Sequence, residues 1–282
     1  MSEAMYQSHF GLREPPFGLT PDTSFAFDAQ AHQEALNVVL VALQAGEGFI
    51  KITGDVGTGK TLLCRRLLAT LGSEYVTAYI PNPLLEPRGL MAALGHEFGL
   101  QLDPRHDPHH LLRTLNQSLV RFATEGKRVV VLIDEAQAMP LATLETLRLL
   151  SNLETEKAKL LQVVLFGQPE LDRNLETPSV RQLKQRITFE YRMDRLGQSE
   201  LRHYLRHRLR VAGYGGPLLF SRLGIWFLHR ATGGVPRLVN ILAHKALLLV
   251  YAEGNDRVGL RHVAAAARDT ASARRVLLPW IV

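Results

Sequence analysis

The stretch Gly54-Asp55-Val56-Gly57-Thr58-Gly59-Lys60-Thr61 matches the pattern G-x-x-x-x-G-K-[ST] at every required position. Its three glycines allow the backbone to curl so that its N–H groups point inward at phosphate oxygens. We expect Lys60 to reach the β- and γ-phosphates of ATP and the Thr61 hydroxyl to bind Mg²⁺. Leu62 follows in a predicted helix over residues 61–71, whose positive N-terminal dipole favours bound phosphate. Residues 54–62 therefore predict a nucleotide-binding loop.

Apolar segments alternate with helical patterns on both sides of this loop. Five runs of apolar or β-branched residues predict strands, at residues 48–53, 75–80, 129–133, 161–166 and 187–191. Helical patterns flank them, at residues 32–45, 61–71, 87–98, 109–123 and 141–153. This alternation is typical of a parallel sheet with helices on both faces. The sequence therefore predicts an α/β fold in three layers.

Two adjacent carboxylates follow the most apolar of these strands. Residues 129–133 (VVVLI) are apolar throughout, as a parallel strand covered on both faces should be. Asp134 and Glu135 come next, at the carboxyl end where open α/β sheets bind their ligands. Buried carboxylates are costly unless a cation or a partner meets them. We expect Asp134 to hold Mg²⁺, directly or through water, and Glu135 to act as general base on the attacking water.

A mostly helical region follows the last predicted strand. Helical patterns occupy residues 199–211, 220–231, 236–252 and 259–270, and the boundary lies near residues 193–198. We expect a nucleotide-binding α/β domain over residues 1–195 and a smaller helical domain over residues 196–282.

The charge is unevenly distributed along the chain. Residues 181–282 carry 18 Lys and Arg against 6 Asp and Glu, whereas the remaining residues carry a net charge of −6. A basic third of a chain can attract nucleic acid, an acidic membrane surface or an acidic partner. The arginines are dispersed, which also fits a solvated helix face. Nucleic acid is therefore the less favoured partner.

The cysteine content and the apolar segments of the sequence indicate the cellular compartment. Its single cysteine, Cys64, excludes an internal disulfide and fits a reducing compartment. Neither a signal-peptide core nor an apolar run of about 20 residues is present. We expect a cytoplasmic protein.

Several segments together resemble the AAA+ ATPases: GDVGTGKT, VVVLIDEAQ, LQVVLFGQPEL, LKQRI and GGVPRLVN. The opening YQSHFGLREPPFGLTPD and FGQPEL resemble more narrowly the ATPases of the secretion ExeA type and of MSHA pilus biogenesis, the MshM group. The resemblance covers nearly the whole chain. It implies an ATP hydrolase with ATP, ADP and Mg²⁺ as ligands, a homo-oligomer such as a ring, and a helical domain that acts as a lid.

The resemblance also implies a phosphate-sensing residue and an arginine finger. Gln168 stands after the fourth strand, where AAA+ proteins carry a polar residue, more often Asn, Ser or Thr, that senses the γ-phosphate. An arginine near the fifth strand reaches into the neighbouring subunit's site as an arginine finger. Arg186 in QLKQRI is our choice and Arg181 is the alternative, while a solvated helix-end arginine is the competing interpretation of either.

Two further assignments rest on the resemblance. Arg237 in GGVPR corresponds to the lid arginine that contacts the γ-phosphate. Pro16 and Phe17 correspond to the segment beside the adenine.

The likeness to secretion ATPases favours assembly of a cell-envelope apparatus, of the MSHA type IV pilus kind, together with an inner-membrane assembly protein. The longer relatives continue into a transmembrane helix and a peptidoglycan-binding domain, so we expect an envelope role here to run through a partner. A DNA-acting AAA+ helper and a nucleotide-gated scaffold are the alternatives.

The last seven residues, 276–282, are mostly apolar and contain Trp280. They either pack onto the protein or dock an envelope partner.

Overall fold

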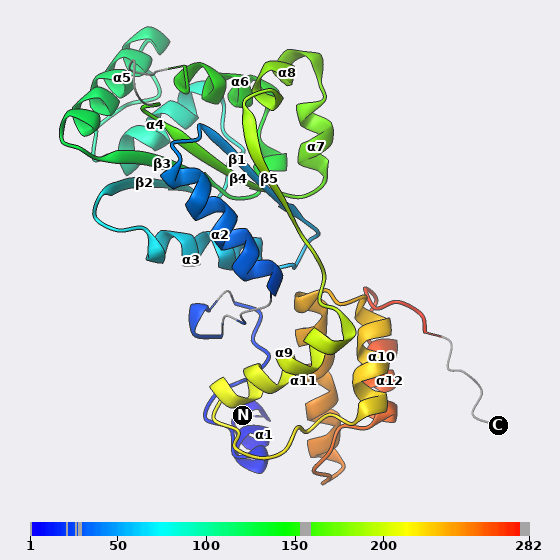
Figure 1. Cartoon of the computed structure of the whole chain (residues 1–282). Coiled ribbons are helices and arrows are strands. Elements are labelled where there is room, and N and C mark those ends of the chain that lie inside the picture. Colours follow the sequence, from blue (N-terminus) through cyan, green and yellow to red (C-terminus); the bar gives the residue numbers. More distant parts are fainter. Residues whose placement is uncertain (1, 21, 26, 28–29, 153–158, 277–282) are drawn as a thin grey trace. The chain divides into compact units, whose positions relative to one another are not determined.

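The computed structural model describes residues 2–20, 22–25, 27, 30–152 and 159–276 (Figure 1). The chain forms two compact units. Unit 1 comprises Met1–Gln30, Val56–Gly59 and Asp194–Val282, and unit 2 comprises Ala31–Asp55 and Lys60–Met193.

Unit 2 is built on a five-stranded sheet. Every strand pairs in parallel with its neighbours, in the order β2-β3-β4-β1-β5. The phosphate loop follows the strand that lies between β4 and β5. The predicted parallel α/β sheet is confirmed, and each predicted strand lies within two residues of the observed one: β1 Phe49–Gly54, β2 Tyr75–Ile80, β3 Arg128–Ile133, β4 Gln162–Gly167 and β5 Ile187–Met193.

Helices cover both faces of this sheet because both faces are apolar. Figure 1 shows α2 (Gln30–Gln44) and α3 (Lys60–Thr70) on one face, where they enclose a core with Ile50 and Ile52 of β1. The opposite face packs against α4 (Pro87–Glu97), α5 (Pro108–Thr124) and α6 (Leu141–Leu150). Along β3 and β4 the apolar side chains alternate between these two cores, as the alternation of side chains along a strand requires.

Unit 2 also contains short helices that the sequence did not predict. They lie in the connections after β3 and β4: η2 (Ala136–Ala138), α7 (Glu170–Leu175), η3 (Pro178–Val180) and α8 (Arg181–Lys184). Segments of three to six residues are too short to show a helical period.

Unit 1 is a helical bundle. Its helices are α1 (Ser2–Phe10), η1 (Thr23–Phe25), α9 (Gln198–Val211), α10 (Arg222–Thr232), α11 (Pro236–Ala252) and α12 (Leu260–Arg268). The last four correspond to the predicted helical region. We expected residues 1–195 to form one domain, but the structure groups Met1–Gln30 with the helical unit.

Buried contacts hold the N-terminal segment within unit 1. Arg208 of α9 is buried, and it donates from Nε to the Pro16 carbonyl at 2.6 Å and from Nη2 to the Gly18 carbonyl at 3.1 Å. Its guanidinium also lies 4.4 Å from the centre of the Phe25 ring. Phe17 is buried edge-on against Phe220. These pairs are far apart in sequence, which is why the sequence pattern did not show them.

The C-terminal prediction is only partly covered by the described residues. Val276 is partly buried against the core of unit 1. Residues 277–282, including Trp280, lie outside the described part of the chain. Among the described residues, no helix combines the length and the apolar character needed to cross a membrane.

Candidate functional site

Lys60 is the first residue of α3 and is almost fully buried. Its ammonium group donates to the carbonyl oxygens of Gly54 at 2.8 Å and Asp55 at 2.9 Å. Burial lowers the pKa of Lys60, while the nearby carboxylates of Glu135 and Asp134 oppose that shift. The lysine is thus a desolvated cation at the start of a helix, suited to meet the phosphates of a nucleotide.

The loop before Lys60 has the backbone that its glycines were expected to supply. Gly57 and Gly59 have φ values of 81° and 96°, in the left-handed region that favours glycine. Thr58 between them is fully buried. Within unit 1, the backbone N–H of Arg237 donates to the Gly57 carbonyl at 3.3 Å. The role of Arg237 toward a γ-phosphate stays a prediction.

Thr61 and Asp134 lie together, as a shared magnesium site would require. The Thr61 hydroxyl donates to Asp134 Oδ2 at 2.6 Å, and Asp134 is only 3% exposed. Burial raises the pKa of Asp134, although the hydrogen bond from Thr61 acts in the opposite direction. Hydroxyl and carboxylate oxygens are hard ligands of the kind Mg²⁺ takes, so these residues fit that ion.

Tyr79 of β2 also belongs to this region. Its pKa is raised to about 12, mainly by burial and also by a hydrogen bond with Asp134. The phenol is therefore protonated at neutral pH.

Glu135 follows Asp134 in an unusual backbone conformation. Among the described residues it is the only non-glycine residue with a positive φ, 51°. Such a conformation is uncommon for a side chain of this size and often marks a functional position. It turns the chain sharply after β3.

Two glutamines hold the carboxylate of Glu135. Gln137 donates from Nε2 to Glu135 Oε2 at 2.5 Å, and Gln168 donates from Nε2 to the same oxygen at 3.0 Å. The Oε1 of Gln137 accepts from the backbone N–H of Gln168 at 2.9 Å, so both ends of the Gln137 amide are used. The sequence prediction included Glu135 and Gln168 but missed Gln137, although it stands only two residues after Glu135.

The two candidate arginine fingers lie near each other in the chain before β5. Arg186 donates from Nη1 to the Ser151 hydroxyl at 3.2 Å and is partly buried. Arg181 begins α8 and is exposed. Neither assignment is tested by a single chain, and both stay predictions.

The adenine-side residues are both buried in unit 1, and Phe17 belongs to its core. The expectation that Pro16 and Phe17 lie beside adenine stays a prediction.

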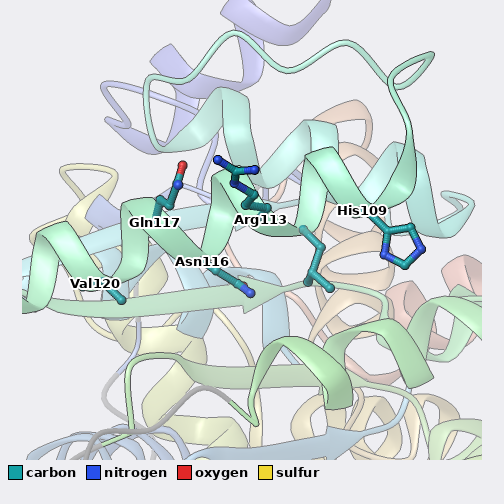
Figure 2. A pocket seen from close by; sticks show the side chains of 6 residues that line it. His109, Arg113, Asn116, Gln117 and Val120 are labelled. Carbon is teal, nitrogen blue, oxygen red and sulfur yellow. The ribbon is translucent and has the colours of Figure 1, made fainter.

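A separate hollow of about 420 Å³ lies along one side of α5 in unit 2 (Figure 2). Figure 2 shows His109, Asn116 and Val120 along it. None of the residues predicted to bind nucleotide lines it.

Comparisons with known proteins agree with this description. Residues 43–175 match the model of a family described as AAA domain. Over 270 residues the chain is 43% identical to the General secretion pathway protein A of Aeromonas hydrophila, covering 96% of this chain and 49% of that protein. The chain thus spans about half the length of this relative. The similarity supports the expected likeness to the secretion type, and the narrower likeness to the MshM group stays a proposal.

Solved structures share the fold at low sequence identity. ORC2 of Aeropyrum pernix has a TM-score of 0.62 at 18% identity, covering 87% of this chain and 68% of its own. Cdc6p of Pyrobaculum aerophilum has a TM-score of 0.66 at 17% identity, covering 84% and 66%. RuvB of Thermotoga maritima has a TM-score of 0.57 at 16% identity, covering 85% and 68%. The chain therefore has the P-loop AAA fold, with the match to the AAA domain over residues 43–175.

Proposed function

We propose that this chain is an ATPase that couples binding and hydrolysis of ATP to the assembly of a cell-envelope apparatus. The observation that carries the ATPase proposal is the grouping of Lys60, the Thr61–Asp134 pair and Glu135 at the carboxyl ends of β1 and β3. This grouping supplies a cation for phosphate, oxygen ligands for a metal, and a base.

Each group has a defined task in the proposed reaction. Lys60 and the loop N–H groups bind the phosphates, and Thr61 and Asp134 hold Mg²⁺. When bound, the ion neutralises charge on the phosphoryl oxygens. Glu135 accepts a proton from the attacking water.

The position of Glu135 depends on its neighbours in this proposal. Gln168 helps to place water near the γ-phosphate, and Gln137 holds the Glu135 carboxylate beside it. The backbone N–H of Gln168 also donates to the side chain of Gln137. Glu135 and Gln168 would therefore move together.

We place the protein in an oligomer, such as a ring, in which Arg186 of one copy acts on the nucleotide of the next, with Arg181 as the alternative. Adenine would lie beside Pro16 and Phe17, and Arg237 would contact the γ-phosphate. The similarity to General secretion pathway protein A supports an envelope role. We further propose that this role is MSHA-type pilus biogenesis, at the cytoplasmic side of the inner membrane and through an assembly protein there.

Two variants test the proposal. Lys60→Ala removes the phosphate-facing cation, so we expect it to lose ATP binding in a calorimetric titration. Glu135→Gln retains the phosphate and metal contacts, so it should hold ATP without turnover. Membrane proteins should co-purify with Glu135→Gln loaded with ATP and not with Lys60→Ala. Normal ATP affinity of Lys60→Ala would contradict the nucleotide site, whereas equal capture by both variants would contradict only the ATP-coupled envelope role.

A further inference from the structure

A second hollow, of about 740 Å³, lies on unit 1 between α9 and α10. We call it the α9–α10 groove. Its lining includes Arg202, His203 and Arg206 from α9 and Arg222 from the first residue of α10. All four of these residues are exposed, and no acidic residue of the described part of the chain lines the groove. The groove is therefore a concave surface of positive charge, separate from the residues assigned to nucleotide.

The two helices that line the groove carry a single carboxylate. The only acidic residue on α9 and α10 is Glu200, whose carboxylate accepts the Gly197 N–H at 2.8 Å. Within the part of the chain that the structure describes, Arg202, Arg206 and Arg222 form neither a salt bridge nor a hydrogen bond to a side chain. An array of unpaired guanidinium groups in a hollow is expected to bind an anionic ligand.

The arrangement of the arginines favours a linear polyanion over a single anion. Arg202 and Arg206 are one helical turn apart, which is a rise of about 6 Å. The two guanidinium groups can therefore meet separate phosphates of one strand, because charge repeats regularly along a nucleic-acid backbone. Arg222 supplies a third cation from the other side of the groove.

Side-chain type and shape narrow the choice of partner. The three cations are all arginines, whose planar donors match phosphate oxygens in pairs. A bilayer surface is flat and would be met by a protruding face, whereas these side chains line a hollow. The sequence pI of about 9.6 and the clustering of arginine on one surface are also typical of nucleic-acid binding.

We propose that the α9–α10 groove binds the phosphodiester backbone of a single nucleic-acid strand. Among the described residues, the lining contains no Phe, Tyr or Trp on which a base could stack, and Ile225 is its one apolar residue. Binding is therefore independent of base sequence and depends strongly on salt.

The test is fluorescence anisotropy with a labelled single-stranded oligonucleotide of mixed sequence, measured without ATP over a series of salt concentrations. Each contact to a single-strand phosphate adds about 0.7 to the slope of log affinity against log salt. Three arginines predict a slope near −2, hence an affinity loss of about 20-fold between about 50 and 200 mM salt. Arg202→Ala combined with Arg206→Ala should reduce the slope by about 1.4 and the loss to about threefold.

The matched control combines Arg210→Ala with Arg268→Ala. Both residues are exposed arginines of unit 1 outside the lining, so this variant has the same net charge as the test variant. The control should keep the wild-type slope, and circular dichroism should show both variants folded.

Three outcomes would overturn the proposal. They are absence of oligonucleotide binding by the wild-type protein, an equal loss in the test and control variants, and displacement of the oligonucleotide by poly-glutamate or phosphatidylserine vesicles at equal charge concentration. Comparing the affinities for DNA and RNA oligonucleotides shows which nucleic acid the groove binds. Because the assay needs no ATP, its failure would leave the proposed ATPase function untouched.

Discussion

Replacing Gln137 with alanine tests how the carboxylate of Glu135 is held for catalysis. The change removes the 2.5 Å hydrogen bond to Glu135 Oε2 and the acceptor of the Gln168 N–H, but it leaves the 3.0 Å bond from the Gln168 side chain. Lys60, Thr61 and Asp134, which we propose to bind phosphate and metal, take part in none of the hydrogen bonds that are lost. Nucleotide affinity should therefore be unchanged while turnover falls.

The size of the effect follows from these contacts. A hydrogen bond to a charged group contributes about 1.5–3 kcal/mol. Since one of two donors to Glu135 remains, we expect a loss near the lower limit, about 1.4 kcal/mol of transition-state stabilisation. This corresponds to a roughly tenfold lower kcat.

A second variant separates positioning of the base from a general loss of structure. Gln137→Glu retains the acceptor for Gln168 but places a second carboxylate beside Glu135, and like charges favour protonation of one of them. A general base acts when deprotonated, so the acid limb of the kcat profile should move to higher pH. A purely structural role for Gln137 predicts no such movement.

The assay is phosphate release, which gives kcat from about pH 5.5 to 8.5. Calorimetry gives the ATP affinity of each variant. Gln101→Ala is the matched control because Gln101 is an exposed glutamine of the same unit. Wild-type kcat in Gln137→Ala, or a fall in ATP affinity as large as the fall in kcat, would refute the proposed role of Gln137.

Three further predictions concern other parts of the chain. Arg186→Ala should lower turnover with little effect on ATP affinity, and mixing it with Glu135→Gln should restore activity; absence of any restoration would argue against a shared site. Burial raises the pKa of the Cys64 thiol above its usual range, so little thiolate forms at pH 8 and iodoacetamide should fail to label the folded protein, as mass spectrometry can check. Arg208→Ala removes the donor to the Pro16 carbonyl and one of the two donors to the Gly18 carbonyl, which keeps its hydrogen bond from Asn240, so urea unfolding should show a loss of about 1–3 kcal/mol; a loss under about 0.5 kcal/mol would contradict the stabilising role of Arg208.

The sheet of unit 2 could be predicted because its strands are short, apolar and separated by helices of ordinary length. Residues 129–133 are a clear case, since a strand buried on both faces leaves no polar position. The grouping of Met1–Gln30 with unit 1 could not be predicted. It depends on contacts such as Arg208 to Pro16, which link residues 192 positions apart.

The candidate site was predictable where a motif specifies it. Lys60, Thr61 and Asp134 follow from the loop pattern and from the end of an apolar strand, and the structure brings Thr61 and Asp134 together. Gln137 was missed because spacing alone does not show that the chain turns at Glu135, with φ 51°, and returns the amide to the carboxylate.

The ATPase proposal is tested most directly by single-turnover hydrolysis of ATP on Glu135→Gln beside the wild-type protein. The variant keeps Lys60 and the Thr61–Asp134 pair, so bound ATP should remain at wild-type occupancy. Loss of the general base should slow phosphate release by about 10²-fold or more. Hydrolysis of bound ATP by Glu135→Gln at the wild-type rate would contradict the proposal that Glu135 is the base of an ATPase.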